Sequence, residues 1–475
     1  MFLLGLDLGT TSVKAAVFDE HGKRYYVRSI EYSLDTDPST GYIELAPEKY
    51  TAICRELIDE AGASFPLTAL SIDSQGETMI LTDADDRPLC PAINWMDCRA
   101  TAEAAAIEAH FGRRRVYEVT GQPEITGGWP ASKLLWFRNN RPELFDRIRH
   151  VYLLEDWIIR DLCGAFVSER TLQSSSVYFD IRCCRWWDEM LDFIGVSSDV
   201  LPQIVPCGTC VGNYGSIKVV AGALDQIAGS IGAGVSRPGQ VSEMTGTIMA
   251  VCAPCTSIPD YTPDSIIPCH LHALDGMYCR LLWSSAAGVA LKWFRDVLMP
   301  GRSFRELDEL AGAVAPGCDG LTFLPHLCGS SMPVYNPDAK GCFYGLTLAH
   351  GGGHFVRAIL ESVAFMLKSD LDYIGLTPGQ GREIRITGGG TAGTLWPQIK
   401  ADVTGFCLGV PTESETACLG AAILAGVGAG AYASLDDAVK SAVGIGRRIT
   451  PSGADYTSAY EAYRSLDAKL NVRKQ

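Results

Sequence analysis

The amino-acid sequence predicts an α/β fold made of two domains of the same design. Three observations support this prediction. Its 475 residues exceed what one hydrophobic core usually serves. Apolar strand-like stretches alternate with amphipathic helix-like ones, which indicates packed layers of sheet and helix. A Gly-Thr turn follows a strand twice, at Gly9-Thr10 and at Gly246-Thr247. The corresponding places of the two turns indicate a duplicated unit with a ligand between the copies.

The first half is expected to open with a strand meander and to continue with alternating helices and strands. Apolar stretches bounded by turn residues predict the meander strands at 2–8, 15–18 and 25–32. A helix is expected over 47–63 because Pro stands in its first turn and apolar residues recur on one face. A strand follows at 67–73, and further helices are expected at 100–109, 132–139 and 142–148.

The second half repeats this plan. Strands are expected at 240–243 and 248–252 around the second Gly-Thr turn. A third strand at 383–387 runs into Gly388-Gly389-Gly390, and a helix follows at 396–404. The segment 231–240 holds three Gly and a Pro and is the expected crossover. The predicted domains are therefore 1–235 and 236–475.

Composition narrows the function classes. A net charge of −15 argues against a nucleic-acid partner. The N-terminus lacks the basic region of a signal peptide, and no stretch is long and apolar enough to cross a membrane, so we expect a cytoplasmic protein. The 17 cysteines are expected to be reduced thiols. Cys207/Cys210 and Cys252/Cys255 have zinc-knuckle spacing, but their wide separation predicts no zinc site.

The turn after the first strand predicts a phosphate site. Gly9 lets the backbone approach a ligand closely, and Thr10 and Thr11 place hydroxyls beside exposed amides. Asp7, at the end of the strand, can hold a hydrated Mg²⁺ opposite the phosphate. The alternative is an ordinary hairpin turn, so the interpretation depends on the later motifs.

Asp225-Gln226 marks a second chemical position. It follows small residues in an expected strand-to-helix turn, where a carboxylate can accept the proton of a hydroxyl nucleophile and Gln226 can orient the same substrate. The alternative for Asp225 is a helix cap. The order of motifs favours the chemical interpretation, because two Gly-Thr turns, an acidic residue and a Gly-Gly-Gly turn supply what phosphoryl transfer requires.

The Gly388-Gly389-Gly390 turn precedes an expected helix, whose N-terminal amides favour an anion such as a nucleotide phosphate. The turn is not a Walker A motif, since no Gly-Lys-Ser/Thr follows. The first turn is not a dinucleotide fingerprint either, because it lacks Gly-x-Gly-x-x-Gly. The two matching Gly-Thr turns predict a nucleotide between the two halves.

Longer motifs resemble the FGGY family of carbohydrate kinases, within the superfamily of actin, hexokinase and the Hsp70 ATPase. The segments 128–136 and 341–361 are similar to the two family signatures. Trp95-Met96-Asp97-Cys98-Arg99, Asp156-Trp157 and Leu162-Cys163-Gly164 also resemble family motifs, and the likeness extends from Leu4 to about Ala425. It implies two ribonuclease-H-like (actin-like ATPase) domains with a cleft between them.

The resemblance also implies roles for matching residues and the use of ATP and Mg²⁺. Asp225 matches the catalytic base, and Asp7 lies near the metal. The implied nucleotide-binding residues are Gly9, Thr10, Thr11, Lys14, Gly246, Thr247, Gly288, Gly388, Gly389, Gly390 and Thr394. The implied acceptor-binding residues are Gln75, Gly76, Glu77, Trp95, Asp225 and Gln226. Lys133, Trp136 and Glu361 of the signatures are expected to be structural.

The acceptor is less closely defined. Xylulokinases resemble Gly-Gln-Met-His-Gly and glycerol kinases Asn-Gln-Arg-Glu-Thr where this chain has Ser74-Gln75-Gly76-Glu77-Thr78. Glu77 can accept hydrogen bonds from two adjacent hydroxyls, and Trp95 can pack on a carbon face. An anionic Glu77 would repel a carboxylate such as gluconate. We therefore expect a short ketose or polyol.

Phosphorylation of a pentulose by ATP is the expected function, with a small sugar or polyol as the partner and a homodimer as the expected assembly. A kinase of glycerol or erythritol is the first alternative. A second alternative, from another class, is a non-catalytic nucleotide-switched binding protein of the actin or Hsp70 type. The latter would need a longer extension than the residues after Ala454, which favours the kinase.

Overall fold

The computed structural model describes residues 1–262, 267–284, 286–331, 336–379 and 382–471. Its first large sheet has the strand order β14-β15-β6-β1-β2-β3. The strands β1, β6 and β15 are mutually parallel, whereas β2, β3 and β14 are antiparallel to their neighbours. Their bounds are β1 Phe2–Leu8, β2 Ser12–Phe18, β3 Arg24–Glu31, β6 Leu67–Ser74, β14 Cys210–Tyr214 and β15 Ile217–Leu224.

The second large sheet repeats the first in strand order and direction. Its order is β18-β19-β17-β16-β22-β23-β24, in which β16, β22 and β23 are parallel. The series β19-β17-β16-β22-β23 therefore matches β3-β2-β1-β6-β15, which confirms the duplicated, ribonuclease-H-like design. The bounds are β16 Val241–Thr245, β17 Met249–Cys255, β18 Cys269–Leu271, β19 Tyr278–Ser284, β22 Glu383–Thr387, β23 Cys407–Pro411 and β24 Ile445–Ile449.

Two helices join the halves. Helix α9 (Asp225–Gly232) follows the first parallel series, and α14 (Thr416–Ala429) follows the second but packs on β1, β6 and β15 of the first sheet. The two helices touch through glycines: a Cβ on Gly420 would lie 1.9 Å from the Ala228 carbonyl oxygen, and one on Gly232 would lie 1.9 Å from that of Thr416. Glycine is required at these contacts because the backbones nearly meet.

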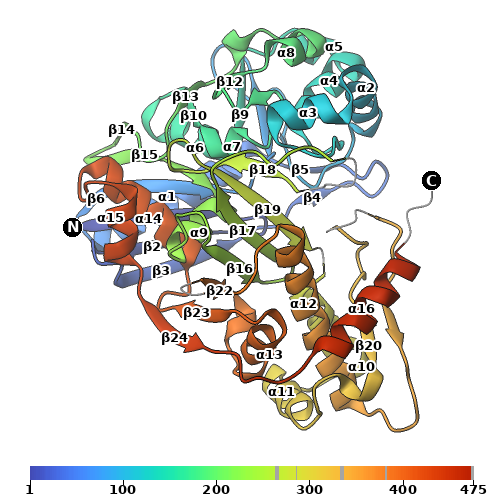
Figure 1. The fold of residues 1–475 in the computed structure, drawn as a ribbon. Coiled ribbons are helices and arrows are strands. Elements are labelled where there is room, and N and C mark those ends of the chain that lie inside the picture. The colour runs from blue at the N-terminus through green and yellow to red at the C-terminus, as the bar shows by residue number, and fades with distance from the viewer. Residues whose placement is uncertain (263–266, 285, 332–335, 380–381, 472–475) are drawn as a thin grey trace.

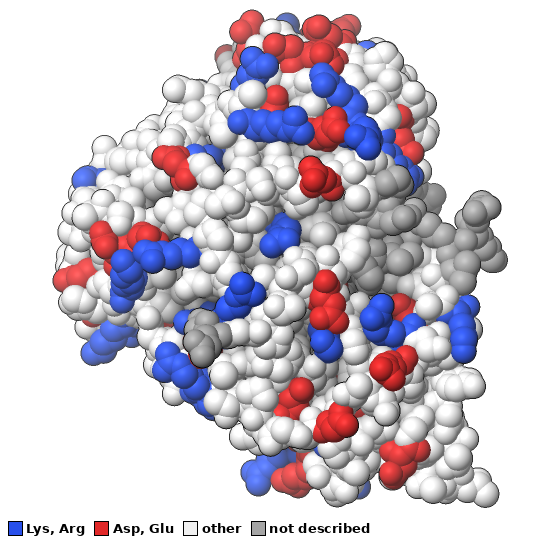
Figure 2. All heavy atoms as spheres, in the orientation of Figure 1, with Lys and Arg blue, Asp and Glu red and all other residues white. Residues whose placement is uncertain are grey.

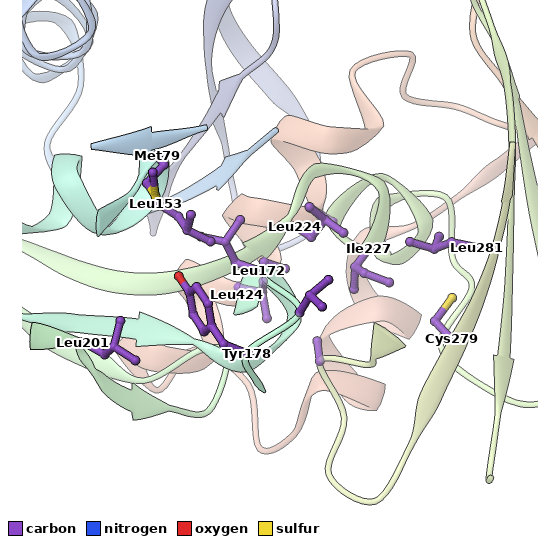
Figure 3. Packing of buried hydrophobic residues seen from close by; sticks show 14 of the residues in the cluster. Met79, Leu153, Leu172, Tyr178, Leu201, Leu224, Ile227, Cys279, Leu281 and Leu424 are labelled. Atoms are coloured by element: carbon purple, nitrogen blue, oxygen red, sulfur yellow. The ribbon is translucent and has the colours of Figure 1, made fainter. Parts of the chain in front are cut away.

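One hydrophobic cluster runs through this joint. It extends from Met79 and Leu153 through Leu424 of α14 and Ile227 of α9 to Leu281 of β19 (Figure 3). Residues on both sides of position 235 thus share a core. The orientation of the two sheets is consequently tied to the packing of α9 and α14 between them (Figure 1).

Further elements extend each half. A five-stranded sheet of order β4-β5-β8-β7-β9 adjoins the first half, and α2 to α5 and α8 gather at the top of Figure 1. The strands of this sheet are β4 Asp35–Thr36, β5 Ile43–Leu45, β7 Met79–Thr82, β8 Ala92–Ile93 and β9 His150–Leu153. Two separate two-stranded sheets are formed by β10 Val167–Glu169 with β13 Gln203–Val205 and by β11 Phe179–Asp180 with β12 Arg185–Trp186. The helices are α1 Pro47–Ser64, α2 Thr101–Phe111, α3 Arg113–Thr120, α4 Pro130–Asn140, α5 Pro142–Phe145, α6 Leu154–Cys163, α7 Arg170–Gln173 and α8 Asp188–Ile194.

The second half carries additional helices beside its sheet, at the lower right of Figure 1. They are α10 Gly288–Leu298, α11 Phe304–Gly312, α12 Gly352–Tyr373, α13 Leu395–Thr404 and α16 Thr457–Leu470, together with the hairpin of β20 Thr322–Leu324 and β21 Cys342–Tyr344. Helix α15 (Leu435–Ala442) follows α14. Short 3₁₀ turns lie at Ser198–Val200, Cys318–Gly320 and Gly389–Thr391.

Several of the expected boundaries differ from those in the structure, and two of the differences are informative. The helix expected over 142–148 ends at Phe145, where the backbone tightens into successive turns. The expected crossover at 231–240 begins inside α9, because Ile231 and Gly232 still belong to the helix that packs on α14. In the part of the chain that the structure describes, no helix has both the length and the apolar character of a membrane span.

Candidate active site

Three aspartates meet at the carboxyl ends of the parallel strands of the first sheet. Asp7 of β1 lies directly opposite Asp73 of β6, and Asp73 in turn pairs with Ala223 of β15. Asp225 follows two residues later as the first residue of α9. Parallel strands present ligand-binding side chains at this edge, so the two predicted residues, Asp7 and Asp225, come together. Asp73 was missed as a site residue by the sequence reasoning.

Asp225 has the properties of a general base. Its Oδ1 accepts a hydrogen bond from the Gln226 backbone N–H at 2.6 Å, and the side chain remains partly exposed. Burial, and then the negative charge of Asp7, raise the pKa of Asp225 to about 7. A base whose pKa lies near the working pH is half ionised and transfers protons efficiently. The backbone hydrogen bond also satisfies an N–H at the start of α9, so the alternative role of Asp225 at the helix start is compatible with its role as a base, which stays a prediction.

The predicted acceptor-binding loop lies beside Asp225. A Cβ on Gly76 would lie 3.2 Å from Cδ1 of Leu224, the residue before Asp225, and 3.0 Å from the Ser175 hydroxyl. Glu77 has a positive φ of 56°, a strained conformation that is typical of functional sites. Burial raises the pKa of Glu77 to about 7. At neutral pH Glu77 is only partly ionised, which weakens the expectation that its charge excludes a carboxylate acceptor.

Lys133 holds this loop in place. Its ammonium group is fully buried and donates to the backbone carbonyls of Glu77 (3.1 Å) and Asn94 (2.9 Å). Strand pairing of Met79 with Ile93 brings the two loops side by side. Burial lowers the pKa of Lys133 to about 8. The lysine is therefore structural, as expected. Its place among mainly apolar residues of the 128–136 segment was the signal in the sequence that it is buried.

A polar network connects the acceptor loop with the first Gly-Thr turn. The Thr10 hydroxyl donates to Oε1 of Gln75 at 3.2 Å and accepts from the Trp95 indole at 3.0 Å. Asn94, which the sequence reasoning missed, donates to Oε1 of Gln75 at 3.5 Å. Trp95 is 40% exposed, so its ring face is available to a ligand. The structure thus brings Thr10, Gln75 and Trp95 together in one hydrogen-bonded group.

The first Gly-Thr turn is tightly closed. The Gly9 N–H donates to the Ser12 carbonyl at 3.0 Å, and the Tyr32 hydroxyl donates to the Gly9 carbonyl. Thr11 is exposed beside it. Lys14 leaves the turn on β2 and forms a 2.5 Å ion pair with Glu415, at the start of α14. The predicted nucleotide residue Lys14 therefore already has a carboxylate partner from the second half.

The second Gly-Thr turn lies against two glycine-rich segments. The Gly288 N–H donates to the Gly246 carbonyl at 3.0 Å, and a Cβ on Gly288 would lie 2.2 Å from that oxygen. A Cβ on Gly388 would lie 2.5 Å from the Thr245 carbonyl. The segment Gly389–Thr391 is a 3₁₀ turn, and Thr394 precedes α13. The structure therefore gathers these predicted residues at the carboxyl ends of β16 and β22.

A buried ion pair supports this second turn. Lys400 of α13 donates to both carboxylate oxygens of Glu243 (3.0 and 2.9 Å) and to the Thr245 hydroxyl (2.7 Å). The two charged side chains are 1% and 0% exposed. Because Thr245 immediately precedes Gly246, the Lys400–Glu243 ion pair holds the end of β16, and with it the start of the second Gly-Thr turn, in place. Nothing in the local sequence indicated this contact, which spans 157 positions.

The Asp7 and Asp73 carboxylates suit a hard divalent cation. Mg²⁺ is commonly bound by one or two carboxylates, with waters and substrate phosphate oxygens completing its shell. Burial raises the pKa of Asp7, and the positive charge of Lys14 opposes this shift. Burial also raises the pKa of Asp73 well above its ordinary value, and the charges of Asp7 and Asp225 add to this. A cation would relieve this repulsion, so the residues fit the metal.

The cysteine pairs have other contacts. Cys207 donates to Glu169 at 3.0 Å, and Cys252 of β17 donates to the Gln226 carbonyl at 3.4 Å. Within the described ranges, no group of three or more His, Cys, Asp or Glu side chains is arranged to hold a metal ion. The Cys252 bond joins the second sheet to the residue after Asp225, so it contributes to the placement of the candidate base.

The chain is similar to known proteins over most of its length. The N-terminal domain model of the FGGY family of carbohydrate kinases matches residues 2–235, and the C-terminal domain model matches residues 273–429. The chain is 28% identical over 461 residues to a xylulose kinase of Lactococcus lactis subsp. lactis (strain IL1403), covering 93% of this chain and 91% of that one.

Two further comparisons extend over nearly the whole chain. The chain is 29% identical over 501 residues to a gluconokinase of Bacillus subtilis (strain 168), covering 99% and 96% of the two chains. A solved structure of a xylulose kinase from Rhodospirillum rubrum is similar with a TM-score of 0.89 at 27% identity, and the match covers 99% of both chains.

Proposed function

The chain belongs to the FGGY family of carbohydrate kinases, and we propose that it transfers the γ-phosphoryl group of ATP to a hydroxyl of a pentulose. Membership of this family makes the protein a carbohydrate kinase. The choice of a pentulose as its acceptor is our proposal. The observation that carries the chemistry is Asp225, a partly exposed carboxylate whose pKa is raised to about 7 beside the acceptor loop. The similarity to xylulose kinases supports a pentulose.

In this mechanism Asp225 accepts the proton of the attacking hydroxyl as that oxygen forms its bond to the γ-phosphorus. Gln226 and Glu77 orient the acceptor, and Trp95 packs against its carbon face. The bond from the γ-phosphorus to the leaving ADP oxygen breaks in line with the attack. The positioned acceptor then competes with water for the phosphoryl group.

The nucleotide is proposed to lie between the two Gly-Thr turns. The amides and hydroxyls of Thr10, Thr11 and Thr247 would contact its phosphates, with Lys14 nearby. Gly246, Gly288, Gly388, Gly389 and Gly390, with Thr394, would form the surface that the rest of the nucleotide approaches. Asp7 would hold Mg²⁺, which neutralises phosphate charge when bound. The close backbone contacts at Gly288 and Gly388 support this assignment, because a side chain there would collide with the turn.

We further propose that the partners are small molecules and that the protein works in the cytoplasm. The net charge of −15 supports the small-molecule partners, since it disfavours nucleic acid. On the face shown in Figure 2, acidic and basic side chains are interspersed and form no basic stripe. Such a surface gives a phosphate backbone no continuous track.

The acid limb of the pH profile provides one prediction. Asp225 must be ionised to accept a proton, and its raised pKa of about 7 means that the active form is lost as the pH falls through 7. We expect kcat/KM to rise with pH, to be half-maximal near pH 7 and to level off at higher pH. The limb should persist in Glu77→Gln, which removes the acceptor-loop carboxylate whose pKa is also about 7. Loss of the limb in that variant would instead assign it to Glu77.

Glu77 provides a second prediction, which concerns the acceptor. Glu77→Ala removes hydrogen bonds to a charged group, each contributing about 1.5–3 kcal/mol, so kcat/KM for the acceptor should fall roughly 10-fold or more. The KM for ATP should stay constant and serves as the internal control. An unchanged kcat/KM for the acceptor would contradict the pocket assignment.

The acceptor itself is tested with a panel of sugars and polyols. We expect xylulose to give the highest kcat/KM, followed by other pentuloses, glycerol and erythritol. Gluconate belongs in the panel because a gluconokinase is among the similar proteins and because Glu77 is only partly ionised at neutral pH. Preferred phosphorylation of gluconate would contradict the assignment of a pentulose as the acceptor, but it would not contradict the kinase activity.

A further inference from the structure

Asp73 is an unusual residue to find between Asp7 and Asp225. Its side chain is fully buried, and in the part of the chain that the structure describes no hydrogen-bond donor reaches either carboxylate oxygen. Its partner across the strands is Asp7, whose own nearby cation, Lys14, is paired with Glu415. Asp73 therefore lies among carboxylates with no cation of its own.

A buried carboxylate in this position needs compensation. Moving an ionised carboxylate from water into a protein interior costs several kcal/mol even after relaxation. Buried carboxylates are accordingly hydrogen-bonded, paired with a cation or bound to a metal. No cation of the described residues pairs with Asp73, and its close polar neighbour is the Asp7 carboxyl, with which it can share a proton only while one of the two is neutral. Because Asp7 is partly exposed, a divalent cation from solution can take the place of that proton and compensate both carboxylates in their ionised form.

We propose that Asp73 is a second protein ligand of the divalent cation assigned to Asp7. This rests on the proposed function for the placement of the metal, and it adds a residue that the motifs did not indicate. Two carboxylates on adjacent parallel strands provide the hard oxygen ligands that Mg²⁺ and Mn²⁺ prefer. The remaining positions are filled by water or by phosphate oxygens.

If Asp73 is a second ligand, the divalent cation can bind to the protein before ATP does. A site with a single carboxylate depends on nucleotide phosphates to retain its ion. With two carboxylates the first sheet holds the ion before ATP arrives, so the protein without nucleotide should bind one Mn²⁺ per chain. The cation then serves as part of the phosphate site rather than entering only with the nucleotide.

The test is titration of the nucleotide-free protein with Mn²⁺, in which the loss of the free-ion electron paramagnetic resonance signal reports binding. Wild type should bind one Mn²⁺, and Mg²⁺ should compete for it. Asp73→Asn and Asp73→Ser should each weaken binding roughly 10- to 100-fold, as should Asp7→Asn. Asp370→Asn is the matched control, because Asp370 of α12 is also buried and also has an unpartnered carboxylate oxygen; it should bind Mn²⁺ as wild type does.

Thermal unfolding and circular dichroism identify any variant that fails to fold, and Asp73→Ser covers that case for Asp73→Asn. Equal Mn²⁺ affinity in wild type and in a folded Asp73 variant would overturn the proposal, as would a wild-type chain that binds no Mn²⁺ without nucleotide. Because the assay contains neither ATP nor sugar, its outcome is independent of phosphoryl transfer. A failed kinase assay and a failed metal assay are therefore distinguishable.

Discussion

Asp225→Asn is expected to lower kcat by about 10²–10⁴ and to leave the Kd for ATP nearly unchanged. The substitution keeps the shape of the side chain and removes its ability to take up the proton of the attacking hydroxyl. ATP binding should persist because the proposed phosphate contacts lie in the two Gly-Thr turns and the glycine-rich segments. Turnover is measured by ADP release with the preferred acceptor, and Kd by calorimetry without acceptor.

The matched control for this experiment is Asp188→Asn. Asp188 is the first residue of α8, as Asp225 is of α9, so the control makes the same change at the same helix position. It should leave kcat unchanged. If Asp225→Asn kept near wild-type turnover, the carboxylate would serve only the start of α9 and the base would have to be sought elsewhere.

Lys400→Met is expected to destabilise the protein by about 3–5 kcal/mol. The substitution leaves Glu243 as a buried charge without its cation, and breaking a buried pair on one side has this cost. The midpoint of urea unfolding, at an unchanged slope, measures the effect. The Thr245 hydroxyl remains as a hydrogen-bond partner of Glu243.

The double variant Lys400→Met with Glu243→Leu separates charge from packing. Replacing both partners by apolar residues removes the unpaired charge, so most of the lost stability should return. A double variant as unstable as the single one would show that shape, rather than charge pairing, holds the end of β16. Both variants are also expected to raise the KM for ATP, because Thr245 immediately precedes the second Gly-Thr turn.

Much of the fold could be predicted because its pattern is local. The strand and turn at 2–11 and its repeat at 241–247 have the spacing that led us to expect a duplicated unit, and the two sheets have matching strand orders. The packing of α14 on α9 could not be predicted, because it depends on backbone contact at Gly420 and Gly232 across about two hundred positions. Small residues within a helix indicate tight packing but not its partner.

The site divides in the same way. Asp7, Asp225 and the Gly-Thr turns stand in recognisable motifs, so they could be assigned from sequence. Asp73 could not be distinguished from an ordinary strand-ending Asp, since only the register of β1 against β6 brings it opposite Asp7. Lys400 and Glu243 likewise meet only in three dimensions. The sequence also predicted an anionic Glu77, whereas burial raises its pKa, and the hydrogen bond of Ser175 and the charge of Lys133, both from other elements, only partly oppose this.

In the proposed mechanism, Asp225 directs phosphoryl transfer from ATP to a small sugar. The most direct measurement follows ADP by coupled assay and the sugar phosphate by mass spectrometry, with ATP, Mg²⁺ and each acceptor of the panel in turn. We expect one sugar phosphate per ADP, with the highest rate for a pentulose and almost none in Asp225→Asn. ADP release at the same rate with and without every acceptor, or a fully active Asp225→Asn, would contradict it.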